Sequence, residues 1–161
     1  MSRIPDSVSF AAQVGARINS LLGARGAAGG KEESFKMGLI RRAREFPGLA
    51  LSLGLPSALT FYMSKAGKKL SDLDKLVKCL RAEGSDGECE DRWRGELSRE
   101  EGSGYLGYIA ILVLALGKLG QEPKPLDYGG LVSVLRELDV RKQRLLMPYL
   151  IEVKKVLEAL G

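Results

Sequence analysis

The chain has 161 residues, of which 45% are hydrophobic and 28% are charged, and its formal net charge is +5. This length is typical of a single domain, here residues 1–161, that buries roughly two-thirds of the surface of its unfolded form. Histidine is the commonest metal ligand and the usual general base near neutral pH, and it is absent. We therefore expect no metal, no cofactor and no catalytic residues.

Apolar residues recur at helical spacing near the N-terminus. Ser7 is the predicted N-cap of a first helix, whose apolar stripe consists of Phe10, Val14, Ile18 and Leu21. Four glycines follow within residues 23–30, which predicts a flexible linker. A second helix is expected over about residues 32–45, with a stripe at Phe35, Leu39, Ala43 and Phe46.

An uncharged stretch covers residues 46–63 and contains Pro47, Gly54 and Pro56. Proline lacks the backbone N–H of a helical residue and glycine loosens a helix, so we do not expect one continuous helix here. We predict two short helical pieces that meet in a corner at Gly54. Pro56 would take the first position of the second piece, where its fixed φ suits a helix start.

The middle of the chain combines one amphipathic helix with a charged segment. Ser71 and Asp74 form an S-x-x-D capping pattern before a stripe at Leu73, Leu76, Val77 and Leu80. Residues 83–104 are dense in glycine and charge, which predicts a charged loop with at most a short helical turn around Trp93.

Cys79 and Cys89 lie ten positions apart, without a CxxC pair or a histidine to complete a zinc site. Two interpretations stay open. The cysteines form a disulfide if the compartment is oxidising or the source is a hyperthermophile, and otherwise they are two free thiols.

Residues 105–119 are apolar nearly all round, which predicts a central helix against which the others pack. A further stripe follows at Leu131, Val134, Leu135 and Leu138. Asp139 is the predicted cap of the last helix, and Pro148 should kink or split that helix. No stretch shows the period-2 alternation of a strand, so the predicted fold class is all-α, a compact bundle of six or seven helices.

Neither long apolar run suits a membrane span, which needs about 20 residues. Residues 46–63 are broken by prolines, and residues 105–117 are too few. The N-terminus also lacks the apolar core of a secretory signal. We expect a cytoplasmic protein with no membrane contact.

The excess positive charge lies in the first half of the chain. Residues 1–70 carry eleven Lys/Arg against four Asp/Glu, a balance of +7, whereas residues 71–161 carry fourteen against sixteen, a balance of −2. Two clusters flank the predicted corner and are candidates for contact with RNA or a partner: Arg41, Arg42 and Arg44, and Lys65, Lys68 and Lys69. A secondary cluster consists of Arg141, Lys142 and Arg144.

Cations gathered in this way can follow a phosphodiester backbone, because each neutralised phosphate releases counterions. The charge pattern alone leaves a merely solvated basic face equally open. Tyr62 and Trp93 are the candidate platforms for base stacking, although core burial is the expected fate of Tyr62.

Residues 38–66, GLIRRAREFPGLALSLGLPSALTFYMSKA, resemble the signature of the small all-helical subunit of type III-B CRISPR effector complexes, the Cmr family. The matching features are Pro47, Gly54-Leu55, the run from Ala58 to Phe61, and Lys65. The resemblance implies a non-catalytic subunit that stacks along the backbone subunits of a ribonucleoprotein for antiviral defence. Its implied partners are the other Cmr subunits, both backbone and large, together with crRNA, target RNA and further copies of itself.

Two other functions fit parts of the sequence. Basic helices joined by short breaks are compatible with a helix-turn-helix DNA-binding regulator, which would prefer a defined duplex over single-stranded RNA. Asp72, Asp74 and nearby glutamates would be the carboxylates of a metal-dependent nuclease, but helix capping and solvation explain them more simply.

Overall fold

The computed structural model describes residues 4–23, 30–83, 85–97 and 104–160, with side chains placed in all of them except 23 and 30–36. Within these ranges the chain is helical and contains no strand, which confirms the predicted all-α class. The elements are α1 (Asp6–Gly23), α2 (Gly30–Leu53), α3 (Leu55–Ala66), the 3-10 helix η2 (Gly67–Asp72), α4 (Leu73–Leu80), α5 (Asp86–Leu97), α6 (Tyr105–Lys118), α7 (Tyr128–Glu137) and α8 (Val140–Leu160).

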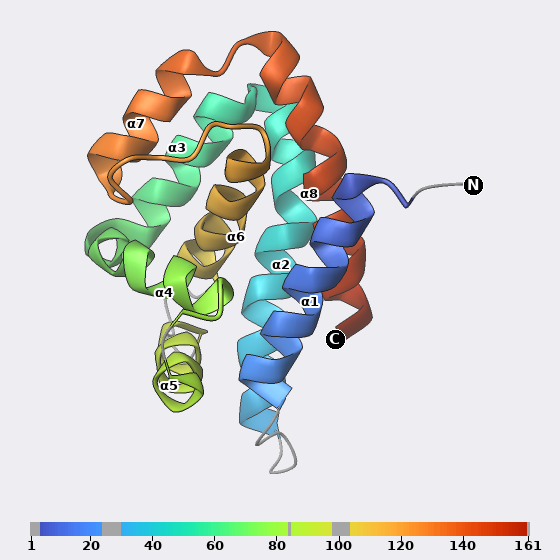
Figure 1. Ribbon diagram of the computed structural model, residues 1–161, viewed down its shortest axis with the longest axis vertical. Helices are drawn as coiled ribbons and strands as arrows, with labels where there is room; N and C mark the ends of the chain where they lie inside the picture. The colour runs from blue at the N-terminus through green and yellow to red at the C-terminus, as the bar shows by residue number, and fades with distance from the viewer. Residues whose placement is uncertain (1–3, 24–29, 84, 98–103, 161) are drawn as a thin grey trace.

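Helix α6 is the centre of the fold, as predicted. Nearly all of its residues are buried, because the helix is apolar on every side and other helices surround it. In Figure 1, α1, α2 and α8 lie side by side to one side of α6, and α3 and α4 lie to the other. The chain therefore places its most apolar segment where several amphipathic helices can cover it.

Helices α1 and α8 pack closely although they are at opposite ends of the chain. A Cβ atom at Gly15 would lie only 2.1 Å from a methyl group of Val156, so the missing side chain permits the approach. The ring of Phe10 meets the ring of Tyr149 edge-on, with centroids 5.5 Å apart. The Tyr149 hydroxyl donates a hydrogen bond to Asp6 Oδ2 at 2.5 Å, which joins the start of α1 to the middle of α8.

Two prolines lie inside continuous helices, so neither splits its helix as the sequence suggested. Helix α2 runs through Pro47 to Leu53, and α8 runs through Pro148 without a split. Buried residues stand on both sides of each proline: Ala43, Phe46 and Ala50 in α2, and Leu146, Leu150 and Val153 in α8. Packing on both sides holds each helix together against a local cost of about 3 kcal/mol per proline.

The prediction of a charged loop over residues 83–104 is wrong for residues 86–97, which form α5. Cys89, Trp93 and Leu97 recur every four positions, and all three are buried, Trp93 completely. A disulfide joins Cys89 to Cys79 in α4, so the thiols are not free. Residues 84 and 98–103 of the predicted loop, together with residues 24–29 of the predicted linker, lie outside the described residues.

The predicted helix starts have mixed outcomes. Asp139 Oδ1 accepts a hydrogen bond from the backbone N–H of Lys142 at 2.8 Å, which confirms the predicted cap. Ser7 lies inside the first turn of α1, which begins one residue earlier. The prediction that Ser71 caps a helix is also wrong. Ser71 belongs to η2, and its hydroxyl donates a hydrogen bond of 3.1 Å to the carbonyl of Lys68.

Candidate RNA- and partner-binding surface

Helices α2 and α3 form a hairpin that turns at Gly54, where the corner is predicted. Gly54 has a φ of 88°, a conformation that glycine adopts without the steric cost of a Cβ atom. Its N–H donates to the carbonyl of Ala50 at 2.9 Å, and its own carbonyl accepts from the N–H of Ala58 at 3.1 Å. Pro56 lies in the first turn of α3, where no intrahelical N–H is required. The corner prediction is therefore confirmed.

The corner itself carries exposed apolar side chains that the sequence pattern did not single out. Leu51 and Leu53 are 75% and 57% exposed, and Phe61 is 43% exposed. A groove of about 460 Å³ lies between α2 and α3, with Leu49 and Phe61 among its lining residues. We call Leu51 and Leu53, which project from the last turn of α2 beside Gly54, the corner patch, and Phe61 lies about 10 Å farther along α3. The sequence signal of the patch is that Leu51 and Leu53 fall off the buried stripe that ends at Ala50.

Arg42 is held within the hairpin. Its guanidinium lies 4.0 Å from the ring centroid of Tyr105, and Nη1 is 3.3 Å from Glu45 Oε2. The Arg42 carbonyl accepts a hydrogen bond of 2.7 Å from the hydroxyl of Tyr62. Arg42 therefore stabilises the junction of α2, α3 and α6 through its side chain and its carbonyl, and its guanidinium is a poor candidate for a ligand contact.

The other two arginines of the first cluster diverge from Arg42. At about 100° per residue, Arg42 and Arg44 point to opposite sides of α2. Arg44 Nε lies 4.0 Å from Glu158 Oε1 on α8. Arg41 is exposed and forms no ion pair with any other described residue. The three arginines do not form one patch, because helical geometry separates residues that are adjacent in sequence.

The lysine cluster lies at the other end of α3 from the corner. Lys65 is about 16 Å along the helix from Gly54, at 1.5 Å per residue. Its ammonium group lies 5.4 Å from the ring centroid of Phe61. Lys68 and Lys69 follow in η2 and are exposed. The chain reverses at Gly54, so this cluster lies near the Arg42 end of the hairpin rather than around the corner.

The secondary cluster lies at the start of α8. The backbone N–H of Lys142 is capped by Asp139, and its ammonium group donates to the carbonyl of Glu137 at 3.5 Å. Arg141 and Arg144 are three positions apart on the helix and exposed, and neither forms an ion pair among the described residues. Only these two cations of the cluster remain available to a ligand.

Neither candidate stacking platform is accessible. Tyr62 and Trp93 are both buried, so neither ring can stack on a base at the surface. Burial and the nearby Glu45 carboxylate raise the pKa of the Tyr62 phenol well above its ordinary value of 10.0. Tyr62 remains a neutral hydrogen-bond donor inside an aromatic cluster with Phe46, Tyr105 and Tyr108.

The described part of the chain contains no group of three or more Cys, Asp or Glu residues arranged to hold a metal ion. No helix within that part is both long enough and apolar enough to span a bilayer. No family model, curated protein or solved structure matches this chain.

Proposed function

We propose that this protein is a non-catalytic small subunit of an RNA-guided type III-B CRISPR ribonucleoprotein, which binds RNA and neighbouring subunits in antiviral defence. One observation carries the proposal. The segment that resembles the Cmr signature folds into a hairpin with an apolar patch at its corner and exposed cations at its open end. The two ends offer surfaces of different chemistry to two kinds of partner.

The corner patch suits a neighbouring protein subunit. Leu51 and Leu53 expose most of their surface to solvent in the isolated chain, and Phe61 is 43% exposed and lines the groove between α2 and α3. Exposed large apolar side chains at the end of a hairpin provide surface that a protein partner can bury. In the proposed complex, a backbone subunit or another copy of this chain covers the patch.

The open end of the hairpin suits an RNA backbone. Arg41 and Lys68 are exposed, and neither forms an ion pair with a described residue. Each side chain can therefore bind a phosphate without first breaking such a pair. Each neutralised phosphate adds sequence-independent, salt-sensitive affinity. Because Tyr62 and Trp93 are buried, binding through these cations reads backbone charge rather than base identity.

The proposal locates the protein in the cytoplasm, and the disulfide restricts the source. Cytoplasmic disulfides are rare in mesophiles and common in hyperthermophilic archaea and bacteria. The bond between Cys79 and Cys89 therefore fits the proposal if the protein comes from such a source. Titration of free thiols in protein extracted under acid quench would test whether the bond exists in the cell.

The first test is native affinity purification of the tagged protein from its own cells, followed by mass spectrometry and sizing of bound RNA. We expect CRISPR backbone subunits to co-purify with a discrete short RNA. Isolation of the protein alone would contradict the proposal. Isolation with duplex DNA would contradict it too and would favour the helix-turn-helix regulator instead.

A charge-reversal pair tests the assigned cations. The double variant Arg41→Glu, Lys68→Glu should bind single-stranded RNA more weakly and with a smaller salt dependence than the wild type, because two phosphate contacts are lost. The control is Arg136→Glu, Lys118→Glu, which makes the same change in net charge at exposed positions of α7 and α6. Equal weakening in both variants would show that only net charge matters and would remove the assigned surface.

A further inference from the structure

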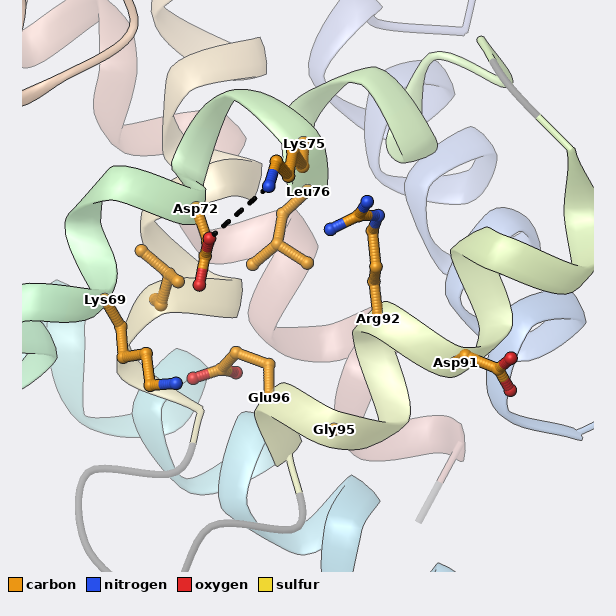
Figure 2. A pocket seen from close by; sticks show the side chains of 9 residues that line it. Lys69, Asp72, Lys75, Leu76, Asp91, Arg92, Gly95 and Glu96 are labelled. Carbon is orange, nitrogen blue, oxygen red and sulfur yellow. Dashed lines mark ion pairs between the residues drawn. The ribbon is translucent and has the colours of Figure 1, made fainter.

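A cavity of about 270 Å³ lies between α5 on one side and η2 and α4 on the other, away from the corner patch. Figure 2 shows its side chains converging from the two walls. Leu76 of α4 and Leu106 of α6 contribute apolar surface to the lining. Lys69, which the sequence assigns to the basic cluster, also lines it. The cavity exists because α5 is a helix fastened to α4, which the sequence pattern did not predict.

Most charges in the lining face a charge of opposite sign. Lys75 Nζ lies 4.0 Å from Asp72 Oδ1, and the dashed line in Figure 2 marks this pair. The side chains of Lys69 and Glu96 point toward one another across the cavity (Figure 2). Glu96 is only 7% exposed, so its carboxylate lies at the buried end of the site.

Arg92 is the exception. Its side chain extends from α5 toward the helix that carries Leu76, whereas the neighbouring Asp91 points away from the cavity (Figure 2). Arg92 forms no ion pair or hydrogen bond through its side chain with any described residue. The cavity therefore contains one guanidinium whose charge is not compensated by the protein around it.

A guanidinium in this setting selects an oxyanion, because its planar N–H groups match the oxygens of a phosphate or carboxylate in pairs. Lys75 can supply a second contact, since its long pair with Asp72 is half-exposed and easily exchanged. A water molecule occupies about 30 Å³ in the liquid, so the cavity has the volume of roughly nine waters. This volume is larger than one oxyanion requires. The remaining space is bordered by Leu76 and Leu106, which suits a sugar or base.

We propose that this cavity binds one phosphate-bearing nucleotide unit, with Arg92 on the phosphate and Lys75 beside it. The unit is either a free mononucleotide or one link of single-stranded RNA. Binding of RNA in this cavity rests on the proposed function and gives the protein a second RNA-contact surface. Binding of a free mononucleotide does not depend on that function.

The test compares Arg92→Gln with Arg136→Gln in the full-length, oxidised protein. Both positions are exposed arginines on helices, and both variants lose one positive charge. Uridine 5′-monophosphate, inorganic phosphate and a short oligouridylate are titrated separately. The NMR signal of the Gly95 amide is the readout in every protein, and the Arg92 Nε–H signal is a second readout in the wild type and in Arg136→Gln. Thermal unfolding shows that each variant is folded.

We expect Arg92→Gln to weaken the binding of the nucleotide or the RNA by about tenfold, the loss of one charge-assisted contact. If RNA is the ligand, the slope of log affinity against log salt should also fall by about 0.7, which a merely structural effect would not produce. Arg136→Gln should leave both quantities unchanged. Inorganic phosphate should bind more weakly than the nucleotide, and equal binding would overturn the assignment of a nucleotide unit.

The outcomes separate this proposal from the previous one. If RNA binding responds to Arg41→Glu, Lys68→Glu but not to Arg92→Gln, and the mononucleotide does not bind, the cavity site is refuted and the proposed function stands. If Arg92→Gln weakens mononucleotide binding about tenfold in a protein that binds no RNA, the cavity site stands and the proposed RNA-binding role is refuted.

Discussion

Gly107 lies in the central helix α6 at the point where α5 packs against it. A Cβ atom at this position would be 2.9 Å from Trp93 Cζ3, 3.3 Å from Glu96 Oε2 and 3.5 Å from Leu39 Cδ1. The Trp93 ring is fully buried, so it has no free space into which it can move. We expect Gly107→Ala to push α5 away from α6 and to lower the free energy of unfolding.

Two opposing terms set the size of this effect. Replacing a helical glycine by alanine stabilises a protein by about 1 kcal/mol, and overpacking a well-filled core costs about 1–3 kcal/mol. The control is Gly117→Ala in the same helix, where a new Cβ atom meets no atom within 4 Å. The difference between the two variants removes the propensity term, so it should equal the overpacking cost. A difference of about 2 kcal/mol corresponds to a Tm difference of roughly 4–8 °C in a domain of this size.

Urea unfolding followed by circular dichroism, with both variants oxidised, measures the difference directly. We expect Gly117→Ala to be at least as stable as the wild type and Gly107→Ala to be less stable than Gly117→Ala. If both alanine variants are stabilised equally, the reasoning is refuted, because Trp93 and Glu96 could then not lie against Gly107.

Two further predictions concern contacts between different helices. The double variant Cys79→Ser, Cys89→Ser should lose about 3 kcal/mol of stability, because the unfolded chain is no longer constrained by a closed loop. Urea unfolding with and without reductant checks this, and a variant as stable as the oxidised wild type would contradict it. The hydrogen bond to Asp6 raises the pKa of Tyr149 from 10.0 to about 12. The contribution of the protonated phenol to stability is therefore complete below pH 10 and is lost progressively from pH 10 to 12. The advantage of the wild type over Tyr149→Phe should be about 1 kcal/mol below pH 10 and should shrink over that interval, and unfolding curves that keep a constant difference up to pH 12 would refute this assignment.

Local sequence signals were sufficient to predict a turn or a helix start where a residue acts on its own backbone or on the backbone a few residues away. Gly54 and Pro56 mark the turn between α2 and α3 because a positive φ and a missing N–H are intrinsic to those residues. Asp139 begins α8 for a similarly local reason, since its carboxylate reaches an N–H three residues later.

Other local signals failed because packing opposed them. Pro47 and Pro148 disrupt a helix locally, but buried residues on both sides hold α2 and α8 continuous. In α5, charge and glycine suggested a loop, while the disulfide and the burial of Trp93 provide the free energy that the segment lacks by itself. Such contacts join residues from different helices, so no window of the sequence contains them.

Amphipathic helices around one apolar helix could be predicted from hydrophobic periodicity, because that pattern specifies which face of each helix must be buried. The sequence also identified which residues carry positive charge. Which of those charges can meet a ligand depends on the packed helices: Arg42 is held against Tyr105 and Arg44 faces Glu158, while Arg92 lines a cavity. The physical reason is that a cation's availability depends on the acids and rings that other helices bring beside it, and that arrangement exists only after the helices pack.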